Sequence, residues 1–346
     1  MNITKEESDT ETRTVRISEF RDYIMVNKGA CRNIIKMGNR YPNAMKLFIY
    51  MCMNMDKTNT IKAFRVKAFQ QAYNFDGKVI SPVSVTAYKR KLLDSGFLDY
   101  KENSGDYVVN PHIVWSTYSE KKESCSFANE AAMLYARFIN EAQTTDYNRA
   151  IMKQEIRAYY TINRNYKRDL YWVAQQDNRA LIVLFYLFSV ADDYNCVHVK
   201  NAGMKVLSEK LGLKRQAISR TISLLVGYNF IYIRKQGRNN EFIINPDLFW
   251  NSDKKLIIHC KFPPSLTINT PARRQQIVEE EHNADYEELA DIVMRYISSN
   301  DMEQICGDTD VKKVAFRRSI VRELNILGNN SAASAVIRFI QALDKE

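Results

Sequence analysis

The fold is decided between residues 203 and 250, where the chain reads GMKVLSEKLGLKRQAISRTISLLVGYNFIYIRKQGRNNEFIINPDLFW. The apolar pattern over residues 204–211 predicts a short helix that ends at Gly212, because glycine adopts positive φ at little cost. A second helix is expected over residues 214–226. Its apolar positions, spaced four and three apart and therefore on one helical face, are Ile218, Ile222 and Leu225.

A β-hairpin is expected after the second helix. Residues 230–233 and 241–244 are rich in aromatic and β-branched side chains, which favour strands, and residues 234–240 form a basic turn between them. Asn245-Pro246 ends the second strand, since proline has no N–H to donate to a ladder. Helix, turn, helix, strand, basic loop, strand is the order of elements in a winged helix.

The polar residues of this motif suit DNA. Arginine, glutamine and serine reach base edges and phosphates in a major groove, and basic hairpin loops contact the backbone. The residues that we expect to contact DNA are Lys214, Arg215, Gln216, Ser219, Arg220, Ser223, Arg234, Lys235 and Arg238. Between residues 200 and 240 the only acidic residue is Glu209, whereas a solvated face usually mixes both signs. The alternative is a small α+β domain that binds no nucleic acid.

Composition supports a nucleic-acid partner. The chain has 346 residues, a formal net charge of +10 and a sequence pI of about 9.1. This length predicts two or three domains, and 45% hydrophobic with 26% charged residues is typical of a globular protein. The basic excess makes nucleic acid the first candidate partner and an anionic membrane surface the second.

A cytoplasmic location is expected. The polar residues 1–14 do not resemble a signal peptide, and the longest apolar run, residues 180–191, is too short to span a bilayer. We therefore expect no membrane association. The six cysteines are scattered without a Cys-x-x-Cys pair, which predicts reduced, buried thiols.

The motif occurs twice. Four segments recur in the same order: Ser81–Tyr100 as Lys214–Ile233, Asn110-Pro111 as Asn245-Pro246, Trp115 as Trp250, and, upstream, Ala44–Tyr50 as Ala180–Tyr186. In the first copy Ser81-Pro82 is a good helix start, with an N-cap serine and a proline in the first turn. Its candidate DNA contacts are Ser81, Val83, Thr86, Arg90 and Lys101. This set is less polar than the second, so we expect the first copy either to read a weaker DNA half-site or to bind a protein surface.

The sequence thus predicts an α+β protein, mainly helical, with two tandem winged-helix domains that arose by internal duplication and a small C-terminal helical region. The expected parts are an N-terminal arm and lead-in (1–41), winged-helix domain 1 (42–116), a helical connector (117–176), winged-helix domain 2 (177–252), a linker (253–275) and an acidic helical region (276–346).

Two further segments allow two interpretations each. Residues 157–168 interleave basic and aromatic residues, which fits either a nucleic-acid contact or packing between domains. Residues 279–303 are strongly acidic and would be repelled by phosphate, so the C-terminal region is expected to bind a protein partner or to self-associate. Its alternative role is a helical subdomain that only packs on the body.

No catalytic constellation is present. The four histidines, His112, His198, His259 and His282, form no pair with the spacing of a metal site, and no Gly-x-x-x-x-Gly-Lys loop exists to bind a nucleotide phosphate. We therefore expect neither an enzyme nor a bound cofactor or metal.

The tandem motif resembles the replication initiator (Rep) proteins of theta-replicating plasmids, over about residues 42–250. The helix at 213–222 followed by a hairpin that closes on Asn245-Pro246 also resembles plasmid replication proteins with a single winged helix. The resemblance implies sequence-specific binding of double-stranded DNA at repeated origin sites and recruitment of replication machinery. Residues 276–346 have no counterpart in it. The alternatives are a winged-helix transcriptional regulator or autorepressor, and a DNA-scaffolding protein of a mobile element.

Overall fold

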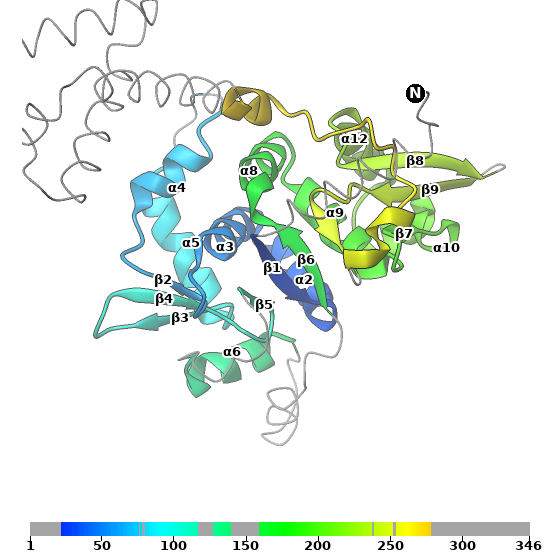
Figure 1. Cartoon of the computed structure of the whole chain (residues 1–346). Coiled ribbons are helices and arrows are strands. Elements are labelled where there is room, and N and C mark those ends of the chain that lie inside the picture. The colour runs from blue at the N-terminus through cyan, green and yellow to red at the C-terminus, as the bar shows by residue number, and fades with distance from the viewer. Residues whose placement is uncertain are drawn as a thin grey trace, which may run out of the picture. The chain divides into compact units, whose positions relative to one another are not determined.

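The computed structural model describes residues 22–75, 77, 80–116, 127–139, 159–236, 239–251 and 254–277 (Figure 1). The chain divides into two compact units, Met1–Ala272 and Arg273–Glu346. Every helix and strand named below belongs to the first unit. The unit combines helices with small antiparallel sheets, which confirms the expected mainly helical α+β class.

Within the described residues, the first half of this unit contains ten elements. They are, in order, β1 (Tyr23–Asn27), η1 (Lys28–Ala30), α2 (Cys31–Arg40), α3 (Pro42–Asn54), β2 (Thr60–Ile61), α4 (Val66–Ala72), α5 (Pro82–Asp94), β3 (Leu98–Lys101), β4 (Asp106–Val109) and β5 (Val114–Trp115). Helices α3 and α5 both begin with proline, whose fixed φ suits the first helical turn. Strands β2, β4 and β3 form a small sheet in that order.

The second half repeats this order. Its elements are β6 (Tyr159–Asn163), η3 (Arg164–Tyr166), α8 (Lys167–Gln176), α9 (Arg179–Val190), β7 (Cys196–Val197), α10 (Val199–Ala202), α11 (Met204–Leu211), α12 (Arg215–Gly227), β8 (Ile231–Gln236), β9 (Asn239–Ile244) and β10 (Phe249–Trp250). The short helix α10 is the one element without a counterpart among the ten above. Helix α6 (Asn129–Ile139) lies between the halves in sequence, and η4 (Lys254–His259) follows them.

A four-stranded antiparallel sheet joins the halves, in the order β10-β6-β1-β5. Figure 1 shows β1 and β6 side by side at its centre. At its centre Met25 of β1 opposes Thr161 of β6. These two residues occupy equivalent positions in the two halves. When the two strands are exchanged, the residue pair on one side becomes the pair on the other side. Such a register relates the two strands by a local twofold rotation, as an isologous interface relates two subunits.

The edge strands follow the same rotation. Trp115 of β5 opposes Met25, and Trp250 of β10 opposes Thr161. Both tryptophans are buried. The central sheet is therefore unchanged in pattern when the two halves are exchanged.

Helices also pack crosswise between the halves. Helix α2 lies against α9, and α8 lies against α3. Gly38 of α2 allows the first contact, because a Cβ there would lie 2.8 Å from Cγ1 of Ile182. At the second, Asn54 Nδ2 donates to the Tyr171 hydroxyl at 2.9 Å. One hydrophobic core consequently runs through both halves.

The two Asn-Pro pairs close the hairpins by the same bonds. Asn110 Nδ2 donates to the Gly96 carbonyl at 2.8 Å, and Asn245 Nδ2 donates to the Asn229 carbonyl at 2.9 Å. Each Oδ1 accepts from the backbone N–H two residues later, at 2.8 and 2.9 Å. Gly96 and Asn229 both have left-handed φ, of 64° and 61°. The asparagine therefore ties the end of each hairpin to the turn that precedes it.

The expected domain boundaries need correction. The connector predicted over residues 117–176 contains Tyr159–Asn163, which is the strand β6 at the centre of the sheet and not a helix. Strand β1 likewise lies in the predicted arm, residues 1–41. The linker predicted over residues 253–275 contains η4 and the buried Phe262. Strands β1 and β6 pair with each other across the halves, whereas Phe262 lies in a cluster with Ile243 and Trp250 of the second half.

The most apolar helix, α9, is twelve residues long and almost wholly buried. Within the described ranges no helix is both long enough and apolar enough to cross a membrane.

We predict that Gly96→Ala lowers the free energy of unfolding much more than Gly105→Ala. Both glycines have positive φ, 64° and 72°, so each alanine costs about 1–2 kcal/mol in backbone strain. Only at Gly96 would the new Cβ also meet α6, at 2.2 Å from the Ala131 carbonyl oxygen, whereas nothing lies within 4 Å at Gly105. Urea unfolding curves of the two variants measure the difference. Equal losses would contradict the contact with α6.

Candidate nucleic-acid interface

The start of α12 is fixed by the turn that precedes it. Helix α11 ends at Gly212, whose φ of 66° reverses the chain, and the Ser208 hydroxyl donates to the Leu213 carbonyl at 2.7 Å. Lys214 then adopts an extended conformation as the N-cap, and its side chain makes no capping bond. The turn therefore sets the angle of α12 while leaving the lysine ammonium in solvent.

Helix α12 has one buried and one exposed face. Ile218, Ile222 and Leu225 are buried, as the spacing predicted. The candidate DNA contacts on the motif's second helix are all exposed: Lys214, Arg215, Gln216, Ser219, Arg220 and Ser223. No acidic side chain lies in α12. Its free face is thus cationic and rich in hydrogen-bond donors.

A partly buried hydrogen bond anchors α12 to the body. The Thr221 hydroxyl donates to the Asp177 carboxylate, and Arg179 Nε lies 2.7 Å from the other oxygen of that carboxylate. Burial alone would raise the pKa of Asp177, but the bonds from Arg179 and Thr221 lower it below its usual value. The carboxylate therefore stays charged and holds α12 against the start of α9.

The hairpin β8–β9 does not present all its basic residues freely. Arg234 of β8 opposes Glu241 of β9, with Nη2 at 2.5 Å from Oε2. The Glu241 side chain is only 4% exposed. Hydrogen bonding to Arg234 lowers the pKa of Glu241, and the same bond raises the pKa of Arg234. The contact of Arg234 with phosphate stays a prediction, and within the hairpin its guanidinium is paired with Glu241. Lys235 is exposed, and Arg238 lies outside the described residues.

In the first half, the candidate DNA contacts on α5 are exposed, but they are apolar or already hydrogen-bonded or paired. Ser81 is the N-cap and accepts from Ser84 N at 3.1 Å, as the sequence predicted, and Val83 is 80% exposed. The Thr86 hydroxyl is also exposed but donates to the backbone one turn earlier. Arg90 is exposed and lies 3.9 Å from an acidic neighbour on the same helix.

Lys101 is the last candidate of the first half, and it is already paired. Its Nζ lies 2.6 Å from Asp99 Oδ2, at the end of strand β3. This pairing, with the exposed Val83 on α5, makes the candidate contacts of the first half less polar than those on α12.

The interleaved stretch 157–168 serves the core where it is described. Tyr160 and Ile162 are buried in β6, and Cys31 Sγ lies 3.1 Å from the Tyr160 hydroxyl. Arg164 is half-buried and donates to Ser116 Oγ at 2.5 Å. Of the two interpretations, packing between the halves is the one that these residues support.

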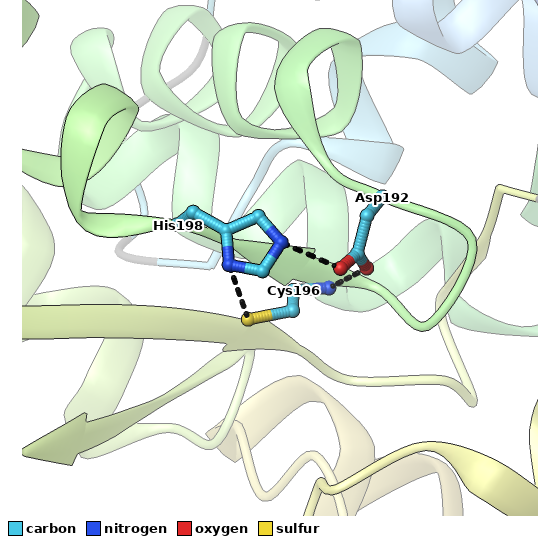
Figure 2. A group of neighbouring side chains, drawn as sticks. All are labelled: Asp192, Cys196 and His198. Carbon is cyan, nitrogen blue, oxygen red and sulfur yellow. Dashed lines mark hydrogen bonds and ion pairs between the residues drawn. The ribbon is translucent and has the colours of Figure 1, made fainter. Parts of the chain in front are cut away.

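Sequence reasoning missed a polar cluster beside the hairpin (Figure 2). His198 Nε2 lies 2.8 Å from Asp192 Oδ2, while its Nδ1 lies 3.2 Å from Glu241 Oε1 and 3.9 Å from Cys196 Sγ. Burial raises the pKa of the Cys196 thiol to about 11. The signal in the sequence was the pair Cys-x-His, because alternate residues of an extended segment share a face.

The expected thiol state agrees with the described cysteines. Cys31, Cys52 and Cys196 are buried and form no disulfide, and Cys260 is buried as well. Burial raises the pKa of Cys31 to about 12, and it raises that of Cys52 further. Cys125 and Cys306 lie outside the described residues.

Comparison with known proteins returned no match among family models, curated proteins or solved structures. Any function must therefore be argued from the residues themselves.

We predict that Arg234→Ala lowers the free energy of unfolding by about 1–3 kcal/mol at pH 7, because it leaves the buried Glu241 carboxylate without its main partner. A depressed folded-state pKa stabilises above the unfolded glutamate value of about 4.3 and is lost as pH falls through the folded value. The difference between wild type and variant should therefore shrink in acid. Lys235→Ala, at an exposed neighbour, is the control, with an expected change within about 0.5 kcal/mol. Denaturant titrations at pH 7 and pH 3.5 measure both, and a pH-independent difference would contradict the pairing.

Proposed function

We propose that this protein binds double-stranded DNA sequence-specifically through α12. The observation that carries the proposal is the exposed face of that helix, on which Arg215, Gln216 and Arg220 stand with no acidic residue beside them. A major groove about 12 Å wide admits an α-helix, and it presents a distinct donor and acceptor pattern for each base pair. Arginine pairs with guanine and glutamine with adenine through two hydrogen bonds each.

Each half is, in this proposal, a winged helix, and the two halves arose by duplication. The matching order of elements, the reciprocal pairing of β1 with β6 and the common bonds of Asn110 and Asn245 support it. Helices α11 and α12 are then the helix-turn-helix, and β8–β9 is the wing. Lys235 supplies a phosphate contact at the wing.

The first half takes a subordinate part. In the register that aligns Ser81 with Lys214, Val83 corresponds to Gln216 and Ala87 to Arg220. Exposed valine and alanine can contact a thymine methyl group but offer no hydrogen bond to a base. We propose that α5 reads a weaker half-site about one helical turn from the site of α12, roughly 34 Å along the duplex.

The resemblance to plasmid Rep proteins extends the proposal to replication initiation. Several copies would bind neighbouring repeats at an origin, strain an adjacent AT-rich segment and admit host replication proteins. The acidic C-terminal region would recruit a partner or another copy. Apart from residues 276 and 277 it lies outside the described residues, so that role rests on its charge alone. A transcriptional autorepressor and a DNA-scaffolding protein use the same contacts.

Footprinting of the purified chain on the DNA that flanks its own gene, at about 0.15 M salt to suppress nonspecific binding, separates these functions. An initiator gives a series of evenly spaced protections beside an AT-rich segment. A single protected palindrome over the promoter would identify a repressor instead. Spread protection without discrete sites would leave only scaffolding.

We predict that Arg220→Ala weakens binding to the cognate site by about 1–3 kcal/mol and relaxes specificity at one base pair, because a base contact is lost. Lys235→Ala should instead weaken binding to all sequences alike and reduce the slope of log K against log salt by about one. Fluorescence anisotropy with cognate and scrambled duplexes at several salt concentrations distinguishes the two. Unchanged affinity of the Arg220 variant for the cognate duplex would refute the assignment of α12.

A further inference from the structure

Three helices, α2, α5 and α6, end around one small pocket of about 290 Å³. The last turn of each helix contributes one exposed basic residue to the lining, namely Arg40, Lys91 and Arg137. None of the three forms an ion pair within the described part of the chain. Among the described lining residues the one carboxylate belongs to Asp94, which lies 3.9 Å from Arg90 on the same helix. The pocket therefore has an excess of positive charge.

The ring of Tyr41 holds two of these cations close together. The guanidinium carbon of Arg40 and Nζ of Lys91 each lie 5.3 Å from the centroid of the ring. Attraction to an aromatic face fixes a cationic side chain, but unlike a carboxylate it does not neutralise the charge. Two like charges held near each other in this way attract an anion to the pocket.

The second half lacks these groups at the equivalent positions. The counterparts there are Asp177 for Tyr41, Gln176 for Arg40 and Leu224 for Lys91. The last turns of α8 and α12 carry no basic residue, although helix dipoles place partial negative charge there as well. The fold forms both helix ends without cations, so the three basic residues serve a purpose particular to the first copy of the motif and its neighbour α6.

The pocket adjoins the turn that leads into α12. Asn39, the residue before Arg40, donates from Nδ2 to the carbonyl of Leu211 at 2.8 Å, and Leu211 is the last residue of α11. In a helix-turn-helix the second helix enters the major groove by its N-terminal residues, so the turn before it lies at the groove edge, beside the phosphates. The exposed Lys210 and Lys214 flank this turn. Positive charge thus continues from the start of α12 to the end of α2.

We propose that Arg40, Lys91 and Arg137 bind a backbone phosphate of the same duplex whose bases α12 reads. Guanidinium groups donate paired hydrogen bonds to phosphate oxygens, and a lysine adds a point charge. This inference rests on the proposed function and gives the first half a task of its own. A phosphate contact adds affinity and sets register without reading sequence, which suits a half whose α5 exposes Val83.

The test measures binding of the full chain to two fluorescent duplexes, the footprinted site and a scrambled one, at several salt concentrations. We expect the double variant Arg40→Gln, Lys91→Gln to lose affinity equally for both duplexes. It should also reduce the slope of log K against log salt by about one, the share of a single phosphate. Arg137→Gln removes the third cation from a different helix without touching Tyr41 and should change affinity and slope in the same direction.

The matched control is the double variant Arg32→Gln, Lys57→Gln. It also removes one arginine and one lysine, both exposed and both outside the lining. The control should keep the wild-type slope, because it changes net charge without removing the phosphate contact. An equal reduction of the slope in the control overturns the proposal, since net charge alone would then account for the effect.

Four further outcomes overturn the pocket assignment. If Arg220→Ala weakens cognate binding while the pocket variants keep the wild-type slope and affinity, this inference fails and the proposed function stands. A loss confined to the cognate duplex would show that the pocket acts through base reading instead. Pocket variants that bind DNA normally but no longer bind phosphatidylserine vesicles would assign the pocket to a membrane surface. A wild-type chain that binds neither duplex overturns both this inference and the proposed function.

Discussion

The antiparallel pairing of β1 with β6 is the interaction on which the rest of the unit depends. Five residue pairs join strands that lie 136 positions apart in sequence, from Tyr23 with Asn163 to Asn27 with Tyr159. This register brings α2 to α9 and α3 to α8, and it places β5 and β10 at the edges. Without it, each half would expose the apolar helix, α3 or α9, that the other half helps to cover.

Much of the local structure could be predicted from sequence, because its causes are local. The apolar spacing of α12, the serine N-cap of α5 and the glycine after α11 each depend on residues within one or two turns. Both hairpins were expected as well, since their strands are adjacent in the chain. The exposed candidates on α12 follow directly from the helical period.

The remaining features depend on register between distant segments. Tyr159–Asn163 is a short strand within a basic, aromatic stretch, and only its partner β1 makes it a strand instead of a helix. The pairing of Arg234 with Glu241 and the approach of His198 to Glu241 need the alignment of β7, β8 and β9. The pairing of Arg234 with Glu241 follows from the register of the hairpin, and the contact of His198 with Glu241, 43 positions apart, needs β7 to pair with β9.

The central sheet is symmetric under exchange of the two halves, so the halves pair as the subunits of a dimer would. This bears on how their association depends on protein concentration. Two identical subunits that meet through such a sheet separate on dilution, and their joint binding falls with the square of concentration. Here both halves belong to one chain, so the partner's effective concentration is set by the covalent connection and not by the amount of protein in the cell. The halves also differ in sequence, as α5 and α12 do. A single molecule therefore keeps the geometry of a dimer at any concentration, while its two halves present different helices.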